Sequence, residues 1–265
     1  MKFTSSVLLV LLVVLVGELL SSNILLKKEY DKVDKTDNYW NYENVLQQPF
    51  KYLKINGGNG TTIAYEQSPK YSVRIQGDWK RYHRGEVKAR VNNDTLYIDF
   101  DYTPANLYEK WWLRTITAVR IFSPELLSVD GSNTIFEMFK LRQKSINVNI
   151  TGKSRFEVES MIPSLDSITI AQQDSSEVIF EMSPVYLTTV IRDPTRIGVS
   201  VASNQQIHSN ESMTINSVNA RLQGYALLDI GHAQVRSLQL QIADSSAIIL
   251  SGGALRKMDK AFLNK

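Results

Sequence analysis

Short alternating strands that each end in a small polar turn recur along the second half of the chain, and this repetition constrains the fold more than any other feature. Asp130, Ile150 and Ile170 occupy comparable places in three such segments, so the step is 20 residues twice. Further copies begin at Met213, Leu227 and Leu238. A period near 20 with polar turns is typical of a β-solenoid, whose coils bury their apolar faces against one another. An ordinary β-sandwich with similar strands is the alternative.

The alternation of apolar and polar residues begins at Phe50. Turn residues divide it into strands expected over residues 50–55, 61–66, 71–76, 86–91 and 95–100, the last two forming a hairpin across residues 92–94. From Phe50 onward we expect one cooperative unit. Side chains of a strand point alternately to its two faces, so we expect the inward-facing residues to include Ile150, Ile170, Ile215 and Ile242.

An apolar segment, residues 5–26, precedes the strands, with Lys2 before it and Lys27 after it. At ~1.5 Å per residue this segment extends ~33 Å, which matches the core of a bilayer. We therefore expect residues 1–26 to form a transmembrane helix that acts as a signal-anchor. The uninterrupted apolar run covers only residues 7–16, so a cleaved signal segment is the competing interpretation.

The rest of the chain divides by composition. We expect a polar stalk over residues 27–48, the β domain over residues 49–255 and a basic C-terminal tail over residues 256–265. The β domain is expected outside the cytoplasm, because the apolar segment is N-terminal and the sequence after it is typical of exported chains. Counting positive charges on the two sides of the segment slightly favours the opposite orientation.

Cysteine is absent, which excludes disulfides, thiol nucleophiles, iron–sulfur ligation and the acylated cysteine of a bacterial lipoprotein. Core packing and β ladders alone must therefore hold an extracytoplasmic domain of this kind. This suits a bacterial envelope better than a eukaryotic secretory route. The net charge of +3 is too small to indicate a nucleic-acid partner.

Four segments resemble one known family in their order along the chain. They are residues 50–58, 63–67, 71–75 and 119–132, and the Ser- and Gly-punctuated strands extend the likeness to about Gly253. The chain here resembles the auto-transporter adhesins with a head GIN domain, which are proteins of bacterial cell envelopes. The resemblance implies a single-stranded right-handed β-helix. It implies no catalytic residue, and no functional residue carries over to this sequence.

The sequence lacks the motifs of known polysaccharide-cleaving β-helices. Enzymes of the pectinase type resemble one another in paired aspartates, a Gly-His motif and an Arg-x-Lys element. Gly231 and His232 match the second motif, but no Asp-Asp pair occurs and no Arg-x-Lys follows. Three scattered histidines do not indicate a transition-metal site. We expect no enzymatic activity, no cofactor and no metal; a polysaccharide-cleaving enzyme that uses carboxylates at the turns is the alternative.

Aromatic and basic residues gather in two stretches, residues 79–84 and residues 111–112. Such side chains stack on sugar rings or contact phosphates. A solvated loop between strands is the other interpretation of the first stretch. The predicted ligand-contact patch consists of Trp79, Lys80, Arg81, Tyr82, Arg84, Trp111 and Trp112.

These features together predict a membrane-anchored binding, adhesion or scaffolding protein of the bacterial cell envelope, with its β domain in the periplasm or at the surface. The expected partners are the membrane, through residues 5–26, and an envelope polysaccharide or envelope protein, with no nucleic acid. A stacked solenoid suits such a role because it displays long rigid faces.

Overall fold

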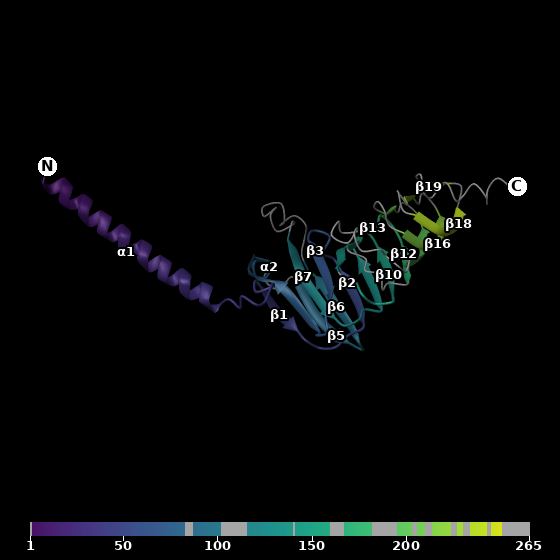
Figure 1. Ribbon diagram of the computed structural model, residues 1–265, viewed down its shortest axis with the longest axis horizontal. Helices are drawn as coiled ribbons and strands as arrows, with labels where there is room; N and C mark the ends of the chain where they lie inside the picture. The colour runs from purple at the N-terminus through teal and green to yellow at the C-terminus, as the bar shows by residue number, and fades with distance from the viewer. Residues whose placement is uncertain are drawn as a thin grey trace. The chain divides into compact units, whose positions relative to one another are not determined.

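Strands account for most of the described residues after residue 42. The structure is a computed structural model, and it describes residues 2–82, 87–101, 116–139, 141–159, 167–181, 195–202, 206–209, 214–223, 227–229, 234–242 and 245–250. Two compact units divide the chain, Met1–Tyr42 and Glu43–Lys265. Figure 1 shows the chain and labels some of its helices and strands.

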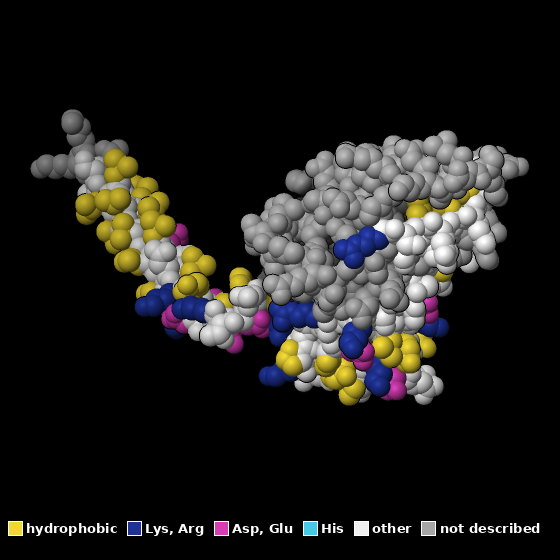
Figure 2. All heavy atoms as spheres, turned by 45° about the vertical axis from the view of Figure 1, so that its right-hand side comes forward, with side chains coloured by type: hydrophobic (Ala, Val, Ile, Leu, Met, Phe, Trp, Pro, Cys, Tyr) yellow, Lys and Arg dark blue, Asp and Glu magenta, His cyan; other side chains and the backbone are white. Residues whose placement is uncertain are grey.

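The first unit contains helix α1 (Lys2–Lys32). Apolar side chains lie around the whole circumference of α1 rather than on one face, and they are exposed from Val7 to Leu26. Figure 2 shows apolar side chains along the visible face of this helix. A helix that is apolar all round is typical of a membrane span, because an interfacial helix has one polar face. The part from Ser5 to Lys32 is long and apolar enough to cross a membrane, and a signal sequence has the same properties.

The strands from Tyr42 onward form two mixed sheets, so the fold is mostly β with an N-terminal helix. The described strands of the nine-stranded sheet are, in spatial order, β18 (Gln234–Ile242), β16 (Thr214–Gln223), β14 (Thr195–Ala202), β12 (Ser167–Gln172), β10 (Ser145–Thr151), β8 (Ser128–Ser132), β2 (Tyr52–Asn56), β6 (Thr95–Phe100) and β5 (Val87–Asn92). The ten-stranded sheet contains β1 (Tyr42–Leu46), β4 (Ser72–Gln76), β7 (Thr117–Ser123), β3 (Thr62–Gln67), β9 (Ile135–Phe139), β11 (Arg155–Glu159), β13 (Glu177–Glu181), β15 (Gln206–Ser209), β17 (Leu227–Asp229) and β19 (Ala247–Ile249).

From β8 to β19 successive strands alternate between the two sheets, and every neighbouring pair within a sheet is parallel. The pairing corrects the register that we expected from the sequence. Ile150 lies opposite Gly131 and Gln172, not opposite Asp130 and Ile170. The steps are 19, 22, 29, 21 and 20 residues along Gly131, Ile150, Gln172, Val201, Leu222 and Ile242. Turns of unequal length therefore hide the true period.

The N-terminal end of the stack follows a route that the sequence did not indicate. Strand β2 lies between β6 and β8, and β3 lies between β7 and β9, so the second and third strands of the chain lie inside the sheets. The antiparallel pair β5–β6 confirms the predicted hairpin. Asn93 and Asp94 both have positive φ at its turn, as a type I′ turn requires. Strand β1 lies within residues 27–48, so the sheet begins before the expected start at Phe50.

Apolar side chains alternate with polar ones along the strands and fill the space between the sheets. Ile150 and Ile170 are buried, as predicted, at 1 % and 0 % exposure. The side chain of Ile215 lies outside the described residues. Ile242 is on the predicted inner side of its strand, but it is 44 % exposed. It pairs with buried Leu222 and so faces the same side, but no described strand pairs with the other edge of β18.

The turns after β8, β10 and β12 fix the edge of the nine-stranded sheet. Asn133, Gly152 and Asp174 all have positive φ there. The side chains of Asn133 and Asp174 accept hydrogen bonds from the backbone N–H of Lys153 (3.1 Å) and of Gly152 (3.0 Å). A Cβ at Gly152 would lie 2.5 Å from Oδ1 of Asn133, so only glycine fits this turn. Each turn is thereby bonded to the next.

Candidate functional site

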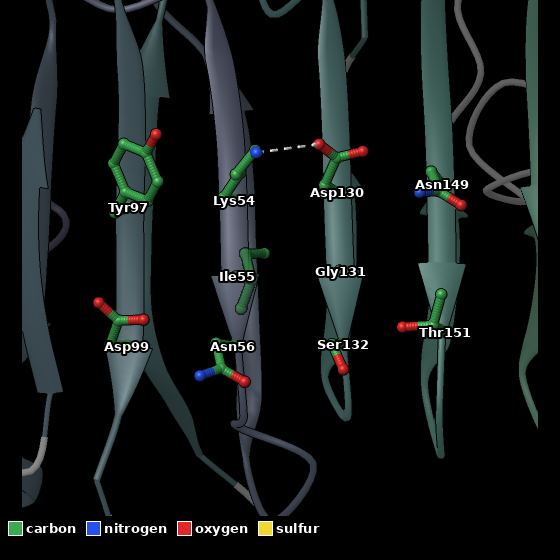
Figure 3. Close-up of a pocket in the computed structure, with 10 residues that line it drawn as sticks. All are labelled: Lys54, Ile55, Asn56, Tyr97, Asp99, Asp130, Gly131, Ser132, Asn149 and Thr151. Atoms are coloured by element: carbon green, nitrogen blue, oxygen red, sulfur yellow. Dashed lines mark ion pairs between the residues drawn. The ribbon is translucent and has the colours of Figure 1, made fainter. Parts of the chain in front are cut away.

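The outer face of the nine-stranded sheet carries a shallow hollow of ≈ 380 Å³, lined by residues of four adjacent strands. Strands β6, β2, β8 and β10 alternate buried apolar and more exposed polar residues, so the same pattern that fills the core presents polar side chains outward. Figure 3 shows these side chains on parallel neighbouring strands.

The polar side chains form two rows across the strands. Because the four strands are parallel and in register, equivalent side chains are ~4.8 Å apart. The first row is Tyr97, Lys54, Asp130 and Asn149. The second row is Asp99, Asn56, Ser132 and Thr151. Ile55 and Gly131 lie between the rows and complete the lining.

The charges at the hollow are paired. Lys54 Nζ is 4.0 Å from Asp130 Oδ2, as the dashed line in Figure 3 marks, and Arg90 of β5 donates a hydrogen bond of 2.6 Å to Asp99. Arg90 also lies over the ring of Tyr97, 5.0 Å from its centroid. These are exposed pairs, each worth ~0–1 kcal/mol at most. The two ion pairs therefore neutralise the charges at the hollow but add little to the stability of the fold.

Several polar side chains of the hollow make no hydrogen bond within the described part of the protein. Among the described residues, the side chains of Asn56, Asn149 and Thr151 make no hydrogen bond with another group. An amide both donates and accepts hydrogen bonds, and so does a hydroxyl. The hollow therefore offers donors and acceptors in alternation to a ligand that has both.

The hollow does not contain the convergent carboxylates of a glycosidase. Asp99 and Asp130 stand two strands apart and two residues out of register, so their Cα atoms are ~12 Å apart by strand geometry. Acid and base carboxyls of such enzymes stand ~5–9.5 Å apart. Each carboxylate also has its own cation, Arg90 or Lys54. Within the described part of the chain, no group of three or more His, Asp or Glu side chains could hold a metal.

With this geometry in place, comparison with known proteins identifies the family. Residues 50–179 match the model of the family described as "Putative auto-transporter adhesin, head GIN domain". These residues belong to that family. The hollow lies within the matched part of the head GIN domain, since all of its lining falls between Lys54 and Thr151.

Several solved structures are similar to this chain. One, from Bacteroides fragilis, is described as a "putative adhesin"; it is 13 % identical with a TM-score of 0.43, over 78 % of this chain and 95 % of that one. Another, from Parabacteroides distasonis, is described as a "putative lipid binding protein"; it is 16 % identical with a TM-score of 0.41, over 80 % and 94 % of the two chains. No curated protein matches the chain.

The residues of the predicted ligand-contact patch differ in exposure: Trp79 is buried, whereas Lys80 and Arg81 are exposed. Trp79 lies on the short helix α2 (Gly77–Tyr82), is 1 % exposed and packs edge-on against Phe100 at 6.2 Å. This corrects its assignment as a ligand contact, because a buried ring cannot reach a surface ligand. Lys80 pairs with Glu43, and Arg81 lies 3.7 Å from Asp78.

The remaining members of that patch are not placed. Tyr82 belongs to α2, but its side chain lies outside the described residues. Arg84, Trp111 and Trp112 lie outside them altogether. The residues of the hollow were missed because each is an ordinary polar residue of an alternating strand. What these residues share is an outward position in several adjacent strands. Recognising it requires the pairing register of the strands, which the unequal turns conceal in the sequence.

Proposed function

We propose that this protein is a membrane-anchored, non-catalytic binding or scaffolding protein of the bacterial envelope, which holds its head GIN domain outside the cytoplasm. The observation that carries this proposal is the hollow of the nine-stranded sheet, whose charges are paired and in which the side chains of Asn56, Asn149 and Thr151 make no hydrogen bond within the described part of the chain. Such a surface suits the recognition of a ligand by hydrogen bonds, and it lacks the paired carboxylates that cleavage of a polysaccharide requires.

Residues 49–255 are proposed to form one single-stranded right-handed β-helix. The alternation of successive strands between two sheets supports this, as does the parallel register within each sheet. A stack of this kind presents a rigid face on which side chains of neighbouring coils keep fixed spacings. An experimental structure that shows the opposite hand, or consecutive strands from β8 onward paired within one sheet, would reject this architecture.

Residues 1–26 are proposed to remain attached as the anchor and residues 256–265 to form a basic tail. Residues 27–48 are proposed as a polar stalk, whose last part includes β1 of the ten-stranded sheet. The apolar circumference of α1 supports the anchor. The protein should stay with membranes after a high-salt wash and after alkaline extraction. Release into the supernatant by alkali contradicts the anchor, and a shortened N-terminus in the mass spectrum indicates a cleaved signal segment instead.

The side of the membrane can be tested with a single cysteine, because the chain has none of its own. Asn147→Cys places a thiol at an exposed position of β10, and the control Val148→Cys places one at a buried position of the same strand. A membrane-impermeant maleimide should label Asn147→Cys in spheroplasts, whereas Val148→Cys should react only after denaturation. Labelling of Asn147→Cys only after lysis would place the domain in the cytoplasm.

Binding itself is tested with the full chain in detergent micelles and a purified fraction of envelope polysaccharide and protein. The wild type should retain material from this fraction, and Asn149→Ala should retain less, while the control Asn147→Ala should behave as the wild type. Asn149 lines the hollow, whereas Asn147 is exposed on the same strand but does not line it. Equal retention by all three proteins would contradict a binding role of the hollow.

A further inference from the structure

The two rows of the hollow suit a ligand that is neutral and rich in hydroxyl groups. Lys54 is opposed by Asp130, and Asp99 is opposed by Arg90, so neither an anion nor a cation finds an unopposed counter-charge. A sugar hydroxyl donates and accepts at once, so it can bond to the ion pairs as well as to the side chains of Asn149 and Thr151. Hydrogen bonds to charged groups are the stronger ones, so the ion pairs also contribute to such binding.

Tyr97 adds an aromatic surface at one end of the first row. Arg90 covers its ring from the side of β5, and the hollow begins on the other side, at Lys54 of β2. The guanidinium holds the ring on the β5 side, so the ring is restrained next to the hollow. A restrained aromatic ring beside polar groups is the arrangement on which the apolar face of a sugar stacks, and stacking costs little entropy when the ring is already held.

The direction of the rows indicates a chain rather than a single sugar. From β6 to β10 the rows run across four strands, which is ~14 Å at the usual strand spacing. The repeat of a linear hexose chain is close to the spacing of strands, so roughly three units fit along a row, each beside the side chains of one or two strands. A monosaccharide would contact only one end of the hollow.

We propose that this hollow binds a neutral linear polysaccharide laid across β6, β2, β8 and β10, with Tyr97 at one end and Asn149 and Thr151 at the other. The inference rests on the proposed binding function and names its ligand class. A protein partner is disfavoured because the centre of protein interfaces is depleted of charged residues and rich in aromatic ones. An anionic membrane surface is disfavoured because it attracts clusters of unpaired Lys and Arg.

The experiment measures binding of the full chain in detergent micelles to cello-, chito- and malto-oligosaccharides, from the monosaccharide to the hexasaccharide, by calorimetry. At least one of these series should bind, with an affinity that rises up to the tri- or tetrasaccharide and then levels off. Tyr97→Ala should weaken binding about tenfold and Asn149→Ala about threefold to tenfold. Tyr97→Phe keeps the ring and should lose little, which separates stacking from hydrogen bonding by the phenol.

Matched controls lie on the same face outside the hollow. Tyr52 of β2 is 41 % exposed and Asn147 of β10 is exposed, and neither lines the hollow. Tyr52→Ala and Asn147→Ala should therefore bind as the wild type does. Unfolding curves of all variants show whether a loss of binding follows from a loss of fold; Asn149→Ala, at an exposed position, serves if Tyr97→Ala is unstable.

Three results would overturn the proposal. If no neutral oligosaccharide binds, while a polyuronate or vesicles containing phosphatidylglycerol bind and Asn149→Ala abolishes this, the ligand class is wrong and the binding function stands. If a neutral series binds but Tyr97→Ala and Asn149→Ala bind as tightly as the controls, the place is wrong. If neither sugars, polyuronate, vesicles nor envelope fractions bind, the proposed function fails together with the inference.

Discussion

Replacing Ile170 by Ala should destabilise the β unit far more than the same replacement at Ile242. Ile170 of β12 is 0 % exposed and stands in register between Val148 and Val199 of the two neighbouring strands. Ile242 of β18 faces the same side of its sheet, but β18 has a described neighbour on one edge only, and its side chain is 44 % exposed. The same three carbon atoms are thus removed from two environments.

The magnitudes follow from burial. Three buried carbon atoms at ~0.8 kcal/mol each, together with the cavity that remains, give a loss of ~2–5 kcal/mol for Ile170→Ala. For Ile242→Ala, little cavity forms and about half of the transfer energy is already absent, so the loss should be about 1 kcal/mol. Ile170→Val, which removes one carbon atom, should cost ~0.5–1.5 kcal/mol.

Urea unfolding of the full chain in detergent, followed by far-UV circular dichroism, measures these differences as shifts of the midpoint at constant slope. Equal losses at Ile170 and Ile242 would refute the reasoning, since they would show that Ile242 is as well covered as Ile170. A negligible loss at Ile170 would refute the register of β12 between β10 and β14, because a one-residue shift turns each side chain to the opposite face.

Three further replacements test other contacts by the same unfolding assay. Gly152→Ala should lower the unfolding free energy by ~2–3 kcal/mol, because Gly152 has positive φ and an added Cβ would approach the side chain of Asn133. The same replacement should cost less in an Asn133→Gly background. If the losses of the two single variants simply add in the double variant, the contact with Asn133 is contradicted. Burial raises the pKa of Tyr65 to about 12 in the folded protein, whereas the pKa of a tyrosine in the unfolded chain is near 10. The contribution of Tyr65 to the unfolding free energy should therefore be constant below pH ~10 and fall as the pH rises toward 12. Tyr65→Phe should remove this fall, and a variant with the same pH profile as the wild type would contradict the assignment to Tyr65. Gln143→Ala should cost ~2–4 kcal/mol, because buried Gln143 bonds both the N–H and the C=O of Leu126; a loss under ~1 kcal/mol would contradict that bridge.

Alternation in the sequence was enough to predict strands, their inner faces and the hairpin around Asn93. These follow from local pattern, since a strand has period two and an Asn-Asp turn accepts positive φ. The order of strands in space was not predictable in this way. Strands β2 and β3 lie inside the sheets because later strands pair with both of their edges, β6 and β8 with β2 and β7 and β9 with β3. No local signal records such a return.

Trp79 shows a second limit, which concerns composition. A tryptophan among Lys, Arg and Tyr is typical of a binding surface, yet Trp79 is buried under α2, and its backbone N–H donates a hydrogen bond of 2.7 Å to Gln76 Oε1. The helical turn directs the aromatic ring inward, while Lys80 and Arg81 remain exposed and pair with acidic residues. Periodicity could have indicated this only if the turn had been recognised as a helix.

The two faces of each strand carry different kinds of information, and this explains why the fold is easier to derive than the site. Inner positions such as Ile55 and Val148 must be apolar, because each coil can be covered only by its neighbours. Outer positions such as Lys54 and Asn149 need only be polar, so packing leaves their identity free. A ligand is then recognised by outer side chains that register, not sequence, brings together. One Ala replacement at Asn149 should therefore change binding with little effect on stability, whereas one at Val148 should do the reverse.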